Sequence, residues 1–421
     1  MSIPAVATRC DKAIDGNTAL LFSEEAPLTN EPARCDDRRA VWTHIPSAFP
    51  KREVYLYFHG HNAYVKVDAA GKSLLSDWVL AHRRAQASGT AASGLKYQLA
   101  ALTNAKHQPL VLAPENGIPV PSYVVGEKVV GGKTAFDAQP ATEATFQKAI
   151  AFRNARLASN QALKQANPAL KDKDLPPVPV DPNLFWSYED PGTFKNSDGL
   201  EKLIANCIEH LCLLTKPAAA GGTPYLDRAT LINAANQSFD VSTLEHLFVS
   251  GHSGGGGPLA AVTLSALTLR IPTSLWYLDA AYSNHGVAEC RTFCENWSAK
   301  GKLGMKNTES RLVLIDFDTK AGTQKIIDNL KSKPFPVAEI THNHSGESAR
   351  KPAEAAAKSA GKTPAEIKAA GQAAVDAEVQ RRLVPVLTAL STEPILAIHT
   401  SVAHDSIPAF YLPILLEHNE A

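Results

Sequence analysis

The sequence predicts an α/β protein with a mostly parallel central sheet and helices on both faces. Short apolar runs typical of buried strands alternate with helical stretches along most of the chain. Apolar residues make up 44% of the 421 residues and charged residues 20%, a composition that supports a large core. A chain of this length holds either one large domain with insertions or two ordinary domains.

The expected elements follow from the apolar pattern. The expected strands, in chain order, are 54–58, 109–113, 244–250, 274–278, 311–317 and 394–398, with a further strand-like segment at 335–340. The expected helices are 74–84, 95–102, 142–165, 200–214, 259–269 and 409–417. Strands of continuous apolar residues indicate a sheet that is buried on both faces.

The segment 247–258, LFVSGHSGGGGP, carries the clearest chemical signal. Gly251, Ser253 and Gly255 have the Gly-x-Ser-x-Gly spacing of a nucleophile elbow, in which a strand ends in a strained turn and a helix begins at once. A phosphate-binding loop is one alternative, but no Gly-Lys-Ser/Thr follows and no acidic residue completes a dinucleotide pattern. A purely structural glycine turn is another. We therefore expect Ser253 to be a nucleophile.

A serine nucleophile needs a base that takes its proton. His404 is the expected base, because it lies on a short polar segment between the apolar run 394–398 and the closing helix. His342 and His344 are rivals, since the strand-like segment before them could also be the last strand of the sheet.

The base in turn needs an acid that holds its tautomer. Asp279 ends the strand after the nucleophile helix, whereas Asp316 and Asp318 end the next strand, the more usual place for the acid. We favour Asp279 because the small-residue turn 280–282 follows it directly, while Asp318 begins what resembles an ordinary helix start.

Two backbone N–H groups should stabilise the negative oxygen of the transition state. One belongs to Gly254. The other is expected in the loop after the first strand, at Gly60 or His61, where a glycine lets the backbone approach closely. His59 and His61 shape this loop; they lack a third ligand, so no metal is expected. We expect His59 and His252 to contact the substrate.

Two insertions interrupt the alternation of strands and helices. Residues 118–189 are too many for a plain loop, and we expect a cap over the site, with Phe185, Trp186 and Tyr188 as pocket walls; a surface appendage is the alternative. Residues 345–382 are rich in Ala, Lys and Glu and should form one or two solvated helices. The main domain is then 51–117 with 190–421, preceded by an N-terminal extension, 1–50.

The formal net charge is zero, which favours neither nucleic acid nor an anionic membrane surface as a partner. The sequence contains no apolar run of about 18 residues, so we expect no membrane span. It also has no recognisable secretory signal. We expect a cytoplasmic protein, with export by a non-classical route still open. The six cysteines contain no C-x-x-C pair, so structural zinc is not expected; a Cys10–Cys35 disulfide and the oligomeric state stay open.

Together these residues resemble those of the α/β-hydrolase superfamily. The resemblance rests on the His59-Gly60 loop, the elbow at 251–255 and His404, and covers roughly 50–117 and 190–420. The segments YFHGHN, SGHSGGG, LDAAY and AHDSIP are similar to those of a group of bacterial serine hydrolases. The resemblance implies a Ser-His-Asp triad that works without metal or organic cofactor, and it is a second reason to choose Asp279 and His404.

The expected function is a serine hydrolase that cleaves a small-molecule or lipid-like carboxylic ester through an acyl-enzyme on Ser253. An amidase, a peptidase or an acyltransferase would use the same residues. A binding protein on a hydrolase scaffold is an alternative from another class, although every catalytic residue type is present in the expected order. The two insertions leave the substrate class undetermined.

Overall fold

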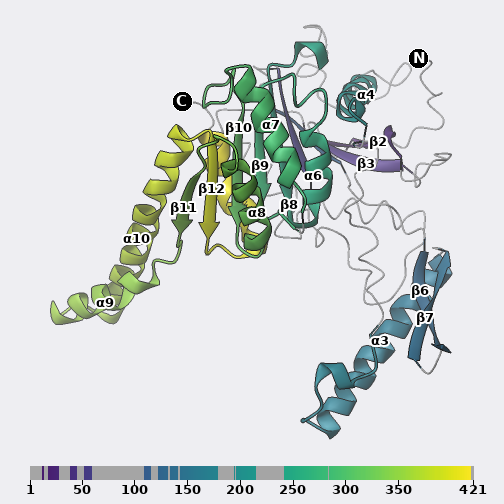
Figure 1. Cartoon of the computed structure of the whole chain (residues 1–421). Helices are drawn as coiled ribbons and strands as arrows, with labels where there is room; N and C mark the ends of the chain where they lie inside the picture. The colour runs from purple at the N-terminus through teal and green to yellow at the C-terminus, as the bar shows by residue number, and fades with distance from the viewer. Residues whose placement is uncertain are drawn as a thin grey trace, which may run out of the picture.

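The computed structural model describes residues 12–13, 18–27, 38–44, 52–58, 109–114, 122–130, 133–140, 143–178, 194, 196–214, 241–282 and 284–418. Its centre is a ten-stranded sheet in the order β1-β2-β3-β5-β4-β8-β9-β10-β12-β11 (Figure 1). The strands are β1 Lys12–Ala13, β2 Thr18–Pro27, β3 Arg38–His44, β4 Glu53–Phe58, β5 Leu110–Pro114, β8 His246–His252, β9 Thr273–Leu278, β10 Arg311–Asp316, β11 Ala338–His342 and β12 Ile395–Thr400.

The sheet is mostly parallel, as the sequence predicted. All neighbours from β5 to β11 pair in parallel, whereas β1, β2 and β3 pair antiparallel with one another and β3 pairs antiparallel with β5. Because parallel strands end at the same edge, the residues that follow β8, β9, β10 and β12 gather along one side of the sheet. This edge carries the candidate site.

Helices cover both faces of the sheet. Side chains alternate across a strand, so Leu275 and Tyr277 join the core under one set of helices, and Trp276 and Leu278 join the core on the other side. The first set comprises α4 Gly199–Leu214, α6 Gly256–Thr263, α7 Val287–Ala299 and α8 Lys320–Lys331. The second comprises α10 Pro364–Thr392 and α11 Ile407–Glu417. Within the described residues, no helix combines the length and the apolar character needed to cross a membrane.

The sheet begins earlier in the chain than expected. Residues 1–50 were expected to be an extension outside the domain, yet β1, β2 and β3 belong to the ten-stranded sheet. The side chains of Leu21, Val41 and Thr43 are buried there. These strands mix apolar with polar and charged residues, so they lack the continuous apolar run that marks the inner strands.

The insertion after β5 forms a separate small unit. β6 Ser122–Val130 and β7 Lys133–Pro140 make an antiparallel hairpin, and α3 Glu143–Ala166 packs against β6. In Figure 1 this unit lies apart from the ten-stranded sheet rather than over its edge. The expected aromatics Phe185, Trp186 and Tyr188 lie outside the described residues, as do the expected helices at 74–84 and 95–102.

The second insertion is helical, but it does not end at residue 382. The helix α9 Arg350–Ser359 buries no residue, and α10 begins with a capping box between Thr363 and Glu366. The same helix then runs on to Thr392 and buries Leu383 and Val386 against the sheet. The solvated start of α10 is therefore continuous with a core helix.

The helix that follows Ser253, α6, is shorter than expected and ends at Thr263 rather than at 269. Its last residues are held by side-chain hydroxyls: Thr268 Oγ1 donates to the Val262 carbonyl at 2.7 Å, and the Thr268 N–H donates to Ser265 Oγ at 3.1 Å. Such hydroxyls offer the backbone an alternative to helical hydrogen bonds.

The turn after β9 is clamped between two helices through glycines. A Cβ added at Gly256, at the start of α6, would overlap the carbonyl oxygen of Ala280. A Cβ at Gly322, in the first turn of α8, would overlap the carbonyl oxygen of Ala281. Backbone this close admits no side chain, so these two glycines set how near α6 and α8 approach the turn.

We expect Gly256→Ala and Gly322→Ala each to lower the free energy of unfolding by about 3 kcal/mol, because the new methyl group must displace backbone. Gly361→Ala is the control: Gly361 has φ 73° and open space around its Cβ position, so the cost there is only the backbone strain of about 1 kcal/mol. Urea unfolding of the three variants measures the ranking. Equal losses in all three would contradict the clamp.

Candidate active site

Ser253 lies on a strained turn between β8 and α6. It has φ 53°, a conformation rare for a residue with a side chain. A single 3-10 turn, Ser253–Gly255, joins the end of the strand to Gly256 at the start of the helix. A Cβ at Gly251 would lie 2.8 Å from the Gly255 carbonyl oxygen. The strand, tight turn and helix expected of a nucleophile elbow are therefore all present.

Asp279 is a fully buried carboxylate at the end of β9, also with a positive φ, 49°. Its oxygens accept hydrogen bonds from the backbone N–H groups of Phe317, Asp318 and Thr319 at 2.9 to 3.1 Å, and from the Thr319 hydroxyl at 2.7 Å. Thr319 is the N-cap of α8. The carboxylate thus lies where the helix dipole and free N–H groups stabilise a negative charge.

His404 lies on the turn between β12 and α11, the position expected from the sequence. Its Nδ1 donates a 2.6 Å hydrogen bond to Asp279 Oδ2. With the Nδ1 proton held by the carboxylate, the neutral ring presents Nε2 as a proton acceptor. The structure thus brings together the acid and the base that the sequence favoured.

The electrostatics of the pair follow from these contacts. Burial by itself would raise the pKa of Asp279, but the hydrogen bonds from His404, Phe317, Thr319 and Asp318 outweigh it and hold that pKa well below its usual value. Burial would lower the pKa of His404, but the Asp279 carboxylate outweighs it and raises that pKa above 6.5. Asp279 is therefore ionised at every pH at which His404 is neutral.

Tyr282 lies beside His404. Its ring packs edge-on against the His404 ring with the centroids 6.4 Å apart. Burial and then the Asp279 carboxylate raise the pKa of its phenol, and the Ser253 hydroxyl lowers it in part. The described part of the chain contains no direct hydrogen bond between Ser253 and His404, so the bond we expect between them stays a prediction. Such contacts often tighten only when substrate is bound.

His252 supports the histidine loop rather than offering a surface to substrate. Its side chain is 1% exposed, and its Nε2 donates to the His404 backbone carbonyl at 3.0 Å. The two rings lie 4.5 Å apart. We expected a substrate contact here; the structure instead buries His252 and fixes the backbone that carries His404.

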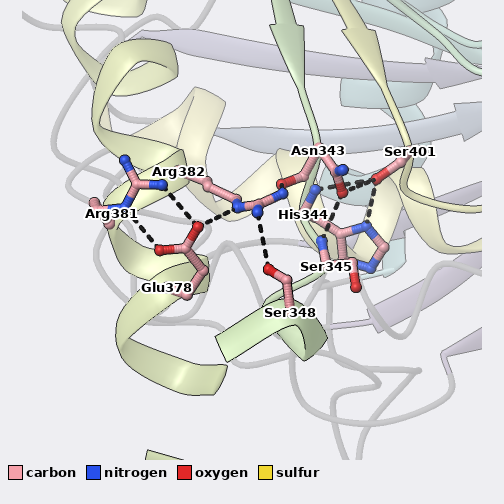
Figure 2. A network of polar contacts seen from close by, with 8 residues as sticks. All are labelled: Asn343, His344, Ser345, Ser348, Glu378, Arg381, Arg382 and Ser401. Atoms are coloured by element: carbon pink, nitrogen blue, oxygen red, sulfur yellow. Dashed lines mark hydrogen bonds and ion pairs between the residues drawn. The ribbon is translucent and has the colours of Figure 1, made fainter. Parts of the chain in front are cut away.

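The rival bases lie in other surroundings. His342 is buried on β11, and its Nδ1 is 2.6 Å from the Tyr411 hydroxyl. Burial, and then the nearby His344 and Arg382, lower its pKa to about 4. His344 bonds to Ser401 through both its backbone N–H and its Nδ1, each at 3.0 Å (Figure 2). Neither histidine bonds to an acid among the described residues.

A polar network connects the helical insertion to the loop of His404 (Figure 2). Arg382 of α10 donates to Glu378 at 2.6 Å, to Ser348 at 3.2 Å and to the Asn343 carbonyl at 3.5 Å. The Asn343 side chain accepts from Ser401, which begins the segment leading to His404. The insertion is therefore connected to this loop through Asn343 and Ser401.

The rival acids do not hold His404. Asp316 is fully buried and pairs with His399 of β12, its direct neighbour in register, at 2.9 Å. Asp318 contributes its backbone N–H to Asp279. The residues that follow β10 thus donate hydrogen bonds to Asp279. They do not provide the carboxylate that bonds to His404.

One ligand atom from each of Asp279, Asp318 and His404 lies within 4.8 Å of the others, close enough to hold a cation. The donor set argues for a hydrogen-bonded pair instead. Asp279 already accepts hydrogen bonds from four donors of the α8 loop and one from His404, so a cation would have to displace one of these donors.

Several expected residues lie outside the described part of the chain: His59, Gly60, His61, Phe185, Trp186, Tyr188, Cys10 and Cys35. The expected oxyanion donor Gly254 is buried in the turn after Ser253. The described cysteines, Cys207, Cys290 and Cys294, are buried and free. Comparison of the chain with family models, curated proteins and solved structures gives no match.

We expect Asp279→Asn to lower the pKa of His404, because the carboxylate that contributes most to raising it is lost while burial, which lowers it, remains. Asp318→Asn removes a carboxylate that contributes least to raising this pKa, so the pKa should fall much less. Titration of the His404 ring protons by NMR measures both variants. An unchanged His404 pKa in Asp279→Asn would show that the pair does not form in solution.

Proposed function

We propose that this protein is a serine hydrolase that cleaves a carboxylic ester through an acyl-enzyme on Ser253. The observation that carries the proposal is the Asp279–His404 pair, 2.6 Å between Oδ2 and Nδ1, on the same sheet edge as a serine with φ 53°. Serine, acid and base occur in the chain order of α/β-hydrolases. The strand order, with antiparallel strands at one side of a parallel sheet, supports the same fold.

In the proposed reaction, Ser253 Oγ attacks the substrate carbonyl carbon and gives its proton to His404 Nε2. Asp279 keeps the Nδ1 proton and stabilises the imidazolium that forms. The negative oxygen accepts hydrogen bonds from the Gly254 N–H and from a second N–H that we assign to Gly60 or His61. His404 then protonates the departing alkoxide, and the acyl-enzyme is hydrolysed by water through the same base.

The proposal includes a cap function for residues 118–189. The insertion leaves the sheet directly after β5, which runs parallel to β4, and β4 runs parallel to β8. The strand that precedes the insertion, β5, therefore ends at the edge at which Ser253 lies. A cap that closes from there would exclude water and strengthen the oxyanion contacts in a lower dielectric.

We expect a fluorophosphonate probe to label Ser253, and Ser253→Ala to abolish both labelling and hydrolysis of p-nitrophenyl esters. The loss in kcat should be about 10⁴-fold or more, because only binding and oxyanion stabilisation remain. Ser359→Ala, at an exposed serine on α9, is the matched control and should keep full activity. Retained activity in Ser253→Ala, or activity that a chelator removes and zinc restores, would overturn the proposal.

We expect Asp279→Asn to lower kcat by about 10⁴-fold, because the amide mis-sets the histidine tautomer. Asp318→Asn should cost far less, since the Asp318 backbone N–H that Asp279 uses is retained. In the unsubstituted protein, kcat/KM should fall as the pH drops through the raised pKa of His404, which lies above 6.5. If Asp318→Asn proved the more damaging variant, the acid would belong to the later strand end.

A further inference from the structure

Tyr282 is the exposed residue in an otherwise buried turn. Asp279, Ala280 and Ala281 are each at most 1% exposed, whereas Tyr282 is 37% exposed. The turn is clamped between α6 and α8 by Gly256 and Gly322, so the backbone that carries this side chain is held firmly. An aromatic residue that faces solvent on a rigid turn beside a serine and a histidine is placed to meet a substrate.

The side chain packs against the proposed base. Its ring lies edge-on to the His404 ring, at an interplanar angle of 80° with the centroids 6.4 Å apart. The Ser253 hydroxyl is among the groups that act on the pKa of its phenol. The phenol therefore lies in the same site as Ser253 and His404.

The charges around Tyr282 keep it a hydrogen-bond donor. Burial, and then the Asp279 carboxylate, raise the pKa of the phenol; Ser253 lowers it, and Asp318 and Asp405 raise it further. The net effect is a pKa above 10. The hydroxyl is thus protonated around neutral pH.

We propose that Tyr282 is a further catalytic residue of the hydrolase, whose hydroxyl donates a hydrogen bond to the departing oxygen of the ester. This inference rests on the proposed function. In the tetrahedral intermediate, the departing oxygen is bonded to the carbon that carries Ser253 Oγ, and it faces the histidine that protonates it. A phenol whose ring packs against the His404 ring is therefore placed to reach that oxygen.

Tyr282 does not change its protonation state when the ester bond breaks. The bond between the carbonyl carbon and the departing oxygen breaks, its electron pair goes to that oxygen, and the proton comes from His404 Nε2. Tyr282 keeps its own proton and stabilises the charge that develops before proton transfer is complete. The benefit is largest for substrates whose departing oxygen becomes strongly basic, so the geometry points to esters of aliphatic alcohols as the substrate class.

The test is Tyr282→Phe, which removes only the hydroxyl, measured with two butyrate esters that share an acyl group. For the ethyl ester, kcat/KM should fall about 10-fold, the value of one hydrogen bond of about 1.4 kcal/mol. For the p-nitrophenyl ester, whose departing oxygen needs little stabilisation, the fall should stay below about 3-fold by the same conversion. Because kcat/KM reports the acylation step, slow deacylation does not hide the difference.

Tyr277→Phe is the matched control, since it removes a buried hydroxyl from β9, the strand that precedes the same turn. We expect this variant to cleave both esters as fast as the unsubstituted protein.

Equal losses with the two esters in Tyr282→Phe would reduce Tyr282 to a positioning or packing residue, and no loss with either would remove its role altogether. Fluorophosphonate labelling of Ser253 in Tyr282→Phe separates the two proposals. A labelled variant without leaving-group dependence overturns this inference alone, whereas an unsubstituted protein that is neither labelled nor active overturns the proposed function and this inference with it.

Discussion

A single buried carboxylate joins three segments that are far apart in the sequence. Asp279, at the end of β9, accepts hydrogen bonds from the loop between β10 and α8 and from His404 after β12. Burying an unpaired charge would be strongly unfavourable. Here the loop N–H groups, the helix N-terminus and the imidazole each supply a donor, so the carboxylate stays ionised. The positions of α8 and of the histidine loop depend on this shell.

Close packing of glycines also fixes the turn that follows Asp279. Gly256 and Gly322 let α6 and α8 approach the carbonyl oxygens of the turn that follows Asp279. Because only one 3-10 turn separates Ser253 from the start of α6, the contact that positions Asp279 also sets the distance between Asp279 and Ser253. Two positive φ angles, at Ser253 and Asp279, are tolerated at this edge, and strain of this kind is typical of sites that need fixed geometry.

Two sets of contacts hold the histidine loop. His252 donates to the His404 carbonyl. Ser401 connects the loop to His344 and Asn343, and Arg382 connects that network to the long helix α10 (Figure 2). The helical insertion, which the sequence marks as a solvated spacer, therefore ends in contacts that bear on the position of the proposed base.

The sequence by itself determined the α/β class, the inner strands and the strand–turn–helix around Ser253, because buried parallel strands and glycine-rich turns leave local patterns. It also placed His404 between the last strand and the last helix. Tertiary structure decided between Asp279 and the later pair Asp316 and Asp318, since both strand ends reach the same sheet edge and only the direction of the hydrogen bonds separates them. It also decided that β2 and β3 join the sheet, because strand pairing depends on residues far away in the chain. The burial of His252 likewise depends on the distant loop that carries His404.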